Sequence, residues 1–142
     1  MINFLSGIAS TTSALNAERI RMDIISQNIA NANTTRGPDG KPYQRQEVAF
    51  ETILNQQQAG LDAQPQNVQV AHIHKDASPP QMVYNPGHPD ADANGMVAMP
   101  NVNIHQEMAD LIASSRSFEA NLAVIKNARA MALQALSIGK RV

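Results

Sequence analysis

The stretch DADANG, residues 90–95, has the spacing of a metal-binding loop. Asp90, Asp92 and Asn94 alternate, and a glycine follows them. Calcium-binding EF-hand loops begin in this way, with oxygen ligands at positions 1, 3 and 5. Such a loop also needs an acidic residue at position 12, where this chain has Asn101. Prolines and glycines replace the flanking helices, which favours a turn whose Asp and Asn side chains accept hydrogen bonds from local amides.

Two histidines form the second candidate for chemistry. His72 and His74 lie two residues apart in a predicted strand, so they share a face and could hold a zinc ion together. A third ligand would have to come from His88, His105 or an acidic residue, and no spacing points to one. A two-histidine clip and a weak calcium contact at the aspartates both stay open, beside the simpler interpretation of exposed polar groups.

The remaining composition argues against several classes of protein. No G-x-S-x-G, H-E-x-x-H or glycine-rich phosphate loop is present, so we expect neither an enzyme nor a cofactor. The chain has 11 Lys and Arg against 12 Asp and Glu, which argues against nucleic-acid binding. With no cysteine, disulfides and thiolate sites are excluded. The first ten residues have no basic n-region, so no Sec signal is expected, and no segment is apolar enough to span a bilayer.

Two long amphipathic helices are predicted, one in residues 1–33 and one in residues 104–142. Apolar residues recur every seven positions, as in helices that pack along a seam. They are Met1, Ile8, Leu15, Met22 and Ile29 in the first helix, and Ile104, Leu111, Phe118 and Ile125 in the second. Met108 and Leu122 take the companion position of the second seam, and Asn103 is placed to cap that helix.

The middle of the chain, residues 34–103, is predicted to be a small β-rich insert. It holds all 8 prolines, and its GPDGKPY stretch has turn chemistry. Strands are predicted at 43–54, 67–75, 81–85 and 95–99 from alternating or short apolar runs. The alternation of the second strand puts Val68, Val70, His72 and His74 on one face. The predicted fold class is therefore α+β, with two terminal helices packed together and a β-rich insert between them.

Each helix needs an apolar partner. The opposite terminus is one partner, but both helices are longer than the small insert could cover, which also indicates partners outside the chain. Two hypotheses follow from pattern alone: a subunit that assembles through its helices, or a self-contained helical adaptor or coiled-coil binding module.

The stretch SQNIANANT, residues 26–34, ends the first predicted helix. Asparagines at a helix end satisfy free backbone groups, and they could also offer amides to a neighbouring subunit. Asn28, Ala30, Asn31 and Thr34 match the N-terminal signature of the bacterial flagellar rod and hook axial proteins. The C-terminal stretch SSRSFEANLAVIKNARAM and the middle segment YNPGHPDADANGMVAMPNVN are similar to the same family, and the middle narrows the resemblance to its proximal rod members.

This resemblance implies a structural protein of the flagellar basal body. Family members are exported without a cleaved signal peptide and form the rod on the periplasmic side of the inner membrane. Their helices pack into a tube that transmits torque and encloses the export channel. Expected partners are copies of the chain, other rod proteins and proteins of the junction between the basal-body ring and the export gate. No nucleic acid or direct lipid binding is expected.

The expected contact residues follow from the seams and the signature. The subunit interface is predicted at Ile8, Leu15, Met22, Ile29, Leu111, Phe118, Leu122 and Ile125. Asn28, Asn31 and Thr34 are expected to fix the helix end and to contact a neighbour.

Overall fold

The computed structural model of the chain describes residues 2–53 and 67–139. Met1, the stretch 54–66 of the predicted insert and residues 140–142 lie outside the described part. The elements in chain order are α1 (Ile2–Ala30), β1 (Gln46–Ile53), β2 (Asn67–Lys75), β3 (Gln81–Tyr84), β4 (Met96–Met99) and α2 (Ile104–Gly139). The predicted α+β class is confirmed, because the described residues form two long helices with four strands between them.

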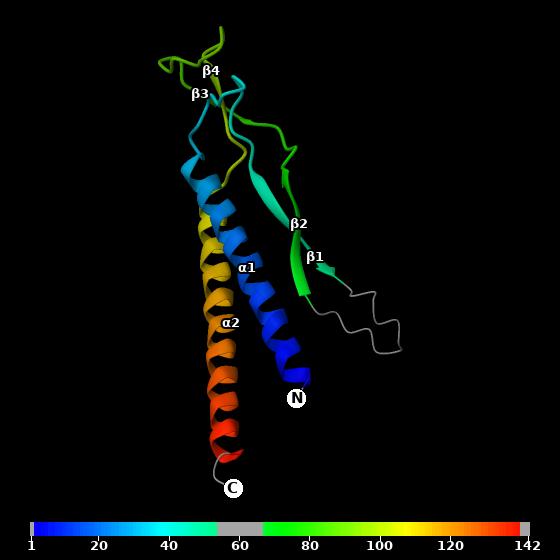
Figure 1. Cartoon of the computed structure of the whole chain (residues 1–142). Helices are drawn as coiled ribbons and strands as arrows, with labels where there is room; N and C mark the ends of the chain where they lie inside the picture. The colour runs from blue at the N-terminus through cyan, green and yellow to red at the C-terminus, as the bar shows by residue number, and fades with distance from the viewer. Residues whose placement is uncertain (1, 54–66, 140–142) are drawn as a thin grey trace.

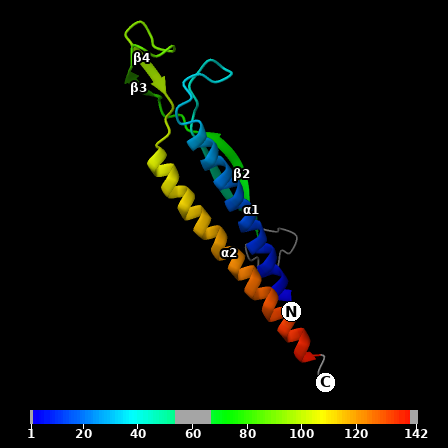
Figure 2. The same cartoon turned by 90° about the vertical axis from the view of Figure 1, so that its left-hand side faces the viewer.

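The molecule is elongated, with α1 in its middle layer. Figure 1 shows α2 along one side of α1 and the β1–β2 hairpin along the other. The two helices run antiparallel, so both chain termini lie at one end and the β3–β4 hairpin lies at the opposite end. Figure 2 shows from a second side that α1 and α2 stay close along most of their length.

In α2 the predicted row of Leu111, Phe118 and Ile125 is half-buried, but the companion row that is covered differs from the predicted one. Met108 is 52% exposed and Leu122 is 37% exposed, although both were predicted to lie in the seam. The residues three positions after each heptad residue are covered instead: Glu107 and Ser114 are buried, and Asn121 and Ala128 are half-buried. The physical reason is that small side chains allow α1 to approach closely, and Glu107 finds polar partners across the contact.

The helix α1 is buried on two sides because it lies between α2 and the hairpin. Its buried side chains are Ala17, Ile24, Ile25 and Asn28. Toward the hairpin, the hydroxyl of Ser13 accepts a hydrogen bond of 3.1 Å from the backbone N–H of Val68. The guanidinium of Arg21 lies 5.9 Å from the ring centre of Phe50 on β1, a cation–π contact. A single helix therefore joins the two layers.

A β-bulge changes the predicted faces of β2. The antiparallel register pairs Phe50 with Val70 but Ala49 with His72, so Ala71 is an extra residue. Paired residues share a face, and neighbours along β1 do not. Val70 and His72 therefore lie on opposite faces, and the prediction that placed both valines and both histidines together was wrong. His72 and His74 remain neighbours, with ring centres 5.7 Å apart.

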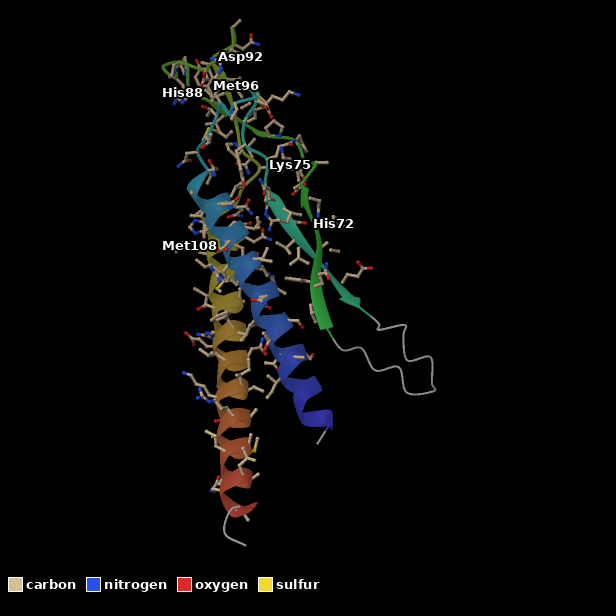
Figure 3. All side chains as sticks on the ribbon, viewed as in Figure 1. His72, Lys75, His88, Asp92, Met96 and Met108 are labelled. Carbon is tan, nitrogen blue, oxygen red and sulfur yellow. The ribbon has the colours of Figure 1, made fainter. Side chains whose placement is uncertain are left out.

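The DADANG stretch is a turn at the end of the molecule far from the termini, where Figure 3 labels Asp92 and Met96. One carboxylate oxygen of Asp92 accepts hydrogen bonds of 2.8 Å from the backbone N–H groups of Asn94 and Met96. Asp90 accepts a hydrogen bond of 2.8 Å from the hydroxyl of Thr35. The predicted turn chemistry is confirmed at Asp92, which accepts from local amides, whereas Asp90 accepts from a residue 55 positions away in the chain.

Two glycines with positive φ, one in the GPDGKPY turn and one in the DADANG turn, allow the packing around the DADANG turn to be tested. Gly40 and Gly95 have φ values of 71° and 75°, a region that L-residues rarely adopt. A Cβ at Gly40 would meet nothing within 4 Å, whereas one at Gly95 would lie 3.0 Å from Cε2 of Tyr84 and 3.1 Å from Cβ of Pro86. We expect Gly40→Ala to lower local stability by about 1 kcal/mol and Gly95→Ala by about 2–3 kcal/mol.

Native-state amide hydrogen exchange of the two loops measures both changes, since it reports local opening. Gly40→Ala is the matched control because it carries the φ cost without the crowding. Equal losses of local stability at the two sites would show that crowding against Tyr84 and Pro86 adds no cost to Gly95→Ala.

Candidate functional site

The end of α1 is closed by its own asparagine and threonine side chains. The helix ends at Ala30, and residues 31–33 form a turn, although the helix was predicted to continue through them. The side chain of Asn31 donates a 2.9 Å hydrogen bond to the carbonyl of Gln27, and its backbone carbonyl accepts one of 3.0 Å from Thr34 N–H. The hydroxyl of Thr34 donates to the Asn31 side-chain oxygen over 3.3 Å. The chain therefore turns away from α1 at a defined point.

Asn28 lies one turn earlier and is 1% exposed. Its amide nitrogen donates to the carbonyl of Gln46 at 2.8 Å and to Oε2 of Glu107 at 3.0 Å. Its oxygen accepts from the hydroxyl of Tyr43 and the N–H of Gln46, each at 2.9 Å. With two donors and two acceptor positions, the Asn28 amide has its full set of partners. It is not available to a neighbouring subunit in this conformation.

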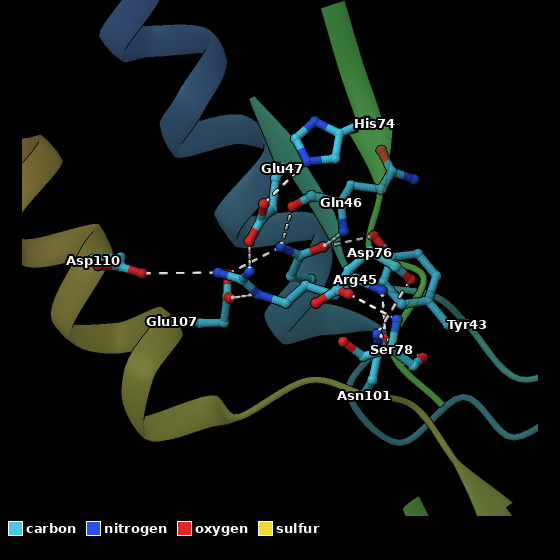
Figure 4. A network of polar contacts seen from close by, with 11 residues as sticks. Tyr43, Arg45, Gln46, Glu47, His74, Asp76, Ser78, Asn101, Glu107 and Asp110 are labelled. Carbon is cyan, nitrogen blue, oxygen red and sulfur yellow. Dashed lines mark hydrogen bonds and ion pairs between the residues drawn. The ribbon is translucent and has the colours of Figure 1, made fainter. Parts of the chain in front are cut away.

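Glu107 connects this amide to a charged side chain. Its Oε1 accepts a 2.6 Å hydrogen bond from Nε of Arg45, and the carboxylate is 1% exposed. Arg45 also pairs with Glu47, and its Nη2 lies 4.0 Å from Asp110 Oδ2. We call Asn28, Tyr43, Arg45, Gln46 and Glu107 the polar junction. Figure 4 shows Arg45 reaching from the start of β1 toward two acidic residues of α2.

A second asparagine supports the polar junction from the other side. The Asn101 oxygen accepts a 2.8 Å hydrogen bond from the backbone N–H of Arg45. Its nitrogen donates to the carbonyls of Asp76 and Ser78 at 3.4 and 3.3 Å. The segment before α2 is thereby tied to the base of the hairpin, and one region joins the ends of α1, β1 and β2 to the start of α2.

Burial and charge in the polar junction shift two pKa values. Burial, followed by the negative charge of Glu107, raises the pKa of Tyr43, so its hydroxyl remains a donor. Burial works against the charge of Arg45, but the hydrogen bond and attraction of Glu107, then those of Glu47, outweigh it and raise the pKa of Arg45. The polar junction therefore holds a protonated arginine and phenol around one carboxylate.

The polar junction has a structural role, in which its polar and charged side chains pair with one another. Its carboxylate accepts from an amide and a guanidinium, and its amide is saturated. Among the described residues, no three His, Asp or Glu side chains gather as metal ligands would. The polar junction holds the α1–α2 pair and the β1–β2 hairpin in a fixed position relative to each other.

The predicted interface residues are mostly half-buried within the chain. Those in this class are Ile8, Leu15, Met22, Ile29, Leu111, Phe118 and Ile125. Leu122 is exposed, as is Ala30 of the signature, while Asn31 and Thr34 are half-buried. The sequence analysis did not identify Arg45, Asn101 or Glu107 as residues that join the helices to the hairpin. No periodicity in the sequence signals the pairing of Glu107 with a residue 79 positions away.

All hydrogen-bonding positions of the Asn28 amide are filled, so even a small substitution of this residue should strongly lower the stability of the fold. Asn28→Asp replaces two donors by a carboxylate oxygen that faces Glu107 and a carbonyl. We expect the free energy of unfolding to fall by about 3–5 kcal/mol, measured by urea unfolding at neutral pH. Two adjacent carboxylates raise each other's pKa above the unfolded value. The loss is therefore full above the folded pKa, and it shrinks as the pH falls through that pKa.

The matched control is Asn31→Asp, the same substitution three residues later at a half-exposed position. Its expected cost is about 1–2 kcal/mol, because the variant loses one exposed hydrogen bond to the Gln27 carbonyl and places an acid at the unfavourable end of the helix dipole. Similar losses for the two variants would contradict the role assigned to Asn28.

Known proteins match this chain along nearly its whole length. The family model for flagella basal body rod proteins matches residues 8–38, and the model for the C-terminal part of flagellar basal body rod FlgEFG proteins matches residues 93–138. The flagellar basal-body rod protein FlgC of Borreliella burgdorferi is 41% identical, over 96% of this chain and 98% of the relative. The FlgC proteins of Bacillus subtilis and Salmonella typhimurium are 41% and 39% identical, over 92% and 90% of this chain and 94% and 92% of their own lengths. The chain therefore belongs to the FlgC family of flagellar basal-body rod proteins.

Proposed function

We propose that this chain is a structural subunit of the rod in the bacterial flagellar basal body. The observation that carries the proposal is the match to rod proteins over 96% of the chain, which includes both helices and the segment between them. The α1–α2 pair forms part of a helical tube in the proximal rod. That tube transmits torque and encloses the export channel.

The eight seam residues have a role in this assembly that follows from their burial. The half-buried members, such as Leu15 and Phe118, first hold α1 against α2 and the hairpin. A rigid helix pair then offers its outer surface to neighbours. Leu122 is 37% exposed, so it is free to contact a neighbour directly. Partners in this scheme are copies of the chain, other rod proteins and proteins at the junction between ring and export gate.

A self-contained helical adaptor is the competing function. One observation favours a subunit over an adaptor: large apolar side chains remain exposed along the whole of α2, from Ile104 at 39% to Ile138 at 68%. A helix that is apolar on several sides needs partners on several sides, whereas an adaptor groove supplies one. An experiment in cells can distinguish the two functions, because only a rod subunit is retained in purified basal bodies.

Charges placed in the seam test the proposed function. We expect Leu15→Asp and Phe118→Asp each to abolish motility and to remove the chain from purified basal bodies, since an unpaired carboxylate in a seam costs several kcal/mol. Swimming assays and immunoblots of basal bodies measure both outcomes in a strain whose own copy is deleted.

The controls place the same charge on the adjacent exposed residue of each helix. Asn16 and Ser117 are exposed and are not part of the seam, so Asn16→Asp and Ser117→Asp should leave the helix pair folded, and we expect both variants to assemble and swim. Full motility of the Leu15 and Phe118 variants would exclude the helical mechanism. If the unaltered chain were missing from basal bodies, the rod function itself would be wrong.

A further inference from the structure

The turn between β3 and β4 contains the one Asn-Gly pair of the sequence, Asn94 and Gly95. Asparagine is chemically labile, because the backbone nitrogen of the next residue can attack the carbonyl carbon of its side chain. Glycine hinders this attack least, since it has no Cβ beside its nitrogen. The side chain of Asn94 is exposed, so water reaches it. Residue types and exposure together mark Asn94 as a reactive position.

The reaction at this pair has two steps. The Gly95 nitrogen gives its proton to solvent and bonds to Cγ of Asn94, while the bond from Cγ to the side-chain nitrogen breaks and ammonia leaves. The product is a five-membered succinimide ring that includes the backbone. Water then opens the ring at one of its two carbonyls and leaves aspartate or isoaspartate at this position. In total, one amide and one water become one carboxylate and one ammonium ion, with no change of oxidation state.

The folded turn restrains the attacking nitrogen. The N–H of Gly95 donates a hydrogen bond of 2.9 Å to the backbone carbonyl of Asp92, which is the bond that closes a β-turn. While this bond is present, the nitrogen keeps its proton and points away from the Asn94 side chain. The turn must therefore open before the reaction can begin.

Asp92 holds the turn closed with its side chain and its backbone. One carboxylate oxygen accepts hydrogen bonds from the N–H groups of Asn94 and Met96, each at 2.8 Å. The backbone N–H of Asp92 donates to the carbonyl of Met96 at 2.8 Å. Figure 3 places Asp92 and Met96 together at the end of the molecule far from the termini. Opening the turn thus breaks several hydrogen bonds that involve one aspartate.

We infer that Asn94 is a site of spontaneous deamidation, and that Asp92 sets its rate by holding the turn that restrains the Gly95 nitrogen. The inference goes beyond the proposed function and does not depend on it, since the reaction needs only this chain and water. Asp92 then protects the covalent structure of the turn as well as its shape.

The isoaspartate product cannot keep the same turn. Its backbone runs through the former side chain, which adds a methylene between positions 94 and 95. The spacing of Asp92 and Met96 changes, although two hydrogen bonds of 2.8 Å join them in the unmodified chain. We therefore expect the amide proton of Met96 to exchange faster in the modified chain, because these bonds are lost.

The reaction is measured on the purified chain at mildly alkaline pH. Peptide mass spectrometry follows the replacement of the side-chain NH₂ of Asn94 by OH, and an isoaspartyl methyltransferase detects isoaspartate. We expect the unaltered chain to deamidate at least about tenfold more slowly when folded than in urea, because only the open turn reacts. In Asn94→Gln the reaction should be far slower in both states, since glutamine must form a larger ring.

Three further variants test the role of Asp92. Asp92→Ala should deamidate at Asn94 at least about fivefold faster than the unaltered folded chain, because both side-chain hydrogen bonds are lost. Asp92→Asn removes the same charge but keeps an acceptor oxygen, so it should retain most of the protection. Asp90→Ala is the matched control and should change the rate little, because the Asp90 carboxylate accepts from Thr35.

Three results would overturn the inference. The first is no deamidation at Asn94 in urea, and the second is an equal rate in the folded and urea-treated chain. The third is a rate in Asp92→Ala that is no higher than in Asp90→Ala. If Asp92→Ala does not fold, Asp92→Asn decides the role of the acceptor oxygen: a folded variant that reacts as fast as the chain in urea would contradict it.

Discussion

The buried carboxylate of Glu107 is the constraint on which the rest of the structure depends. A carboxylate that is 1% exposed must be paired, because an isolated buried charge is very costly. Its two oxygens accept from Asn28 on α1 and Arg45 at the start of β1, at 3.0 and 2.6 Å. These bonds set the register of the helices and the position of the hairpin at once. A shift of one helical turn would leave the carboxylate unpaired, so the antiparallel alignment is specified by chemistry as well as by apolar packing.

That register decides which apolar surface stays outside. The contact with α1 uses Ser114 and Ala128, whose small side chains permit a close approach. Leu111, Phe118 and Ile125 are half-buried, but other large side chains, Leu122 among them, are left on the outer surface of α2. Leaving so many large apolar side chains exposed gives up hydrophobic burial that a self-sufficient domain would gain. It is consistent with a subunit whose larger gain comes from assembly.

The insert shows how local irregularities direct the chain. One extra residue, Ala71, turns the two histidines of β2 to the face opposite Val70. At the far end, Asp92 accepts hydrogen bonds from two backbone amides, and Gly95 takes a positive φ. A stretch whose sequence resembles a calcium-binding loop therefore forms a tight turn between β3 and β4. The returning segment then passes Asn101, which bonds the base of the hairpin before α2 begins.

The sequence by itself determined the order and type of the elements. Periods of seven and two, the Asn103 cap and the Gly-containing turns are local signals, and local signals predicted both helices, the strands and the turn at Asp92. Only the tertiary structure decided which of two possible companion rows on α2 is covered beside Leu111 and Phe118, since both rows satisfy a heptad. The bulge could not be predicted either, because the alternation of residue types continues along the sequence of β2 when an extra residue shifts its pairing with β1. The polar junction joins Asn28 to a residue 79 positions away, and no periodicity relates side chains at that separation. Long-range polar pairing depends on where the chain returns, and the fold alone determines that.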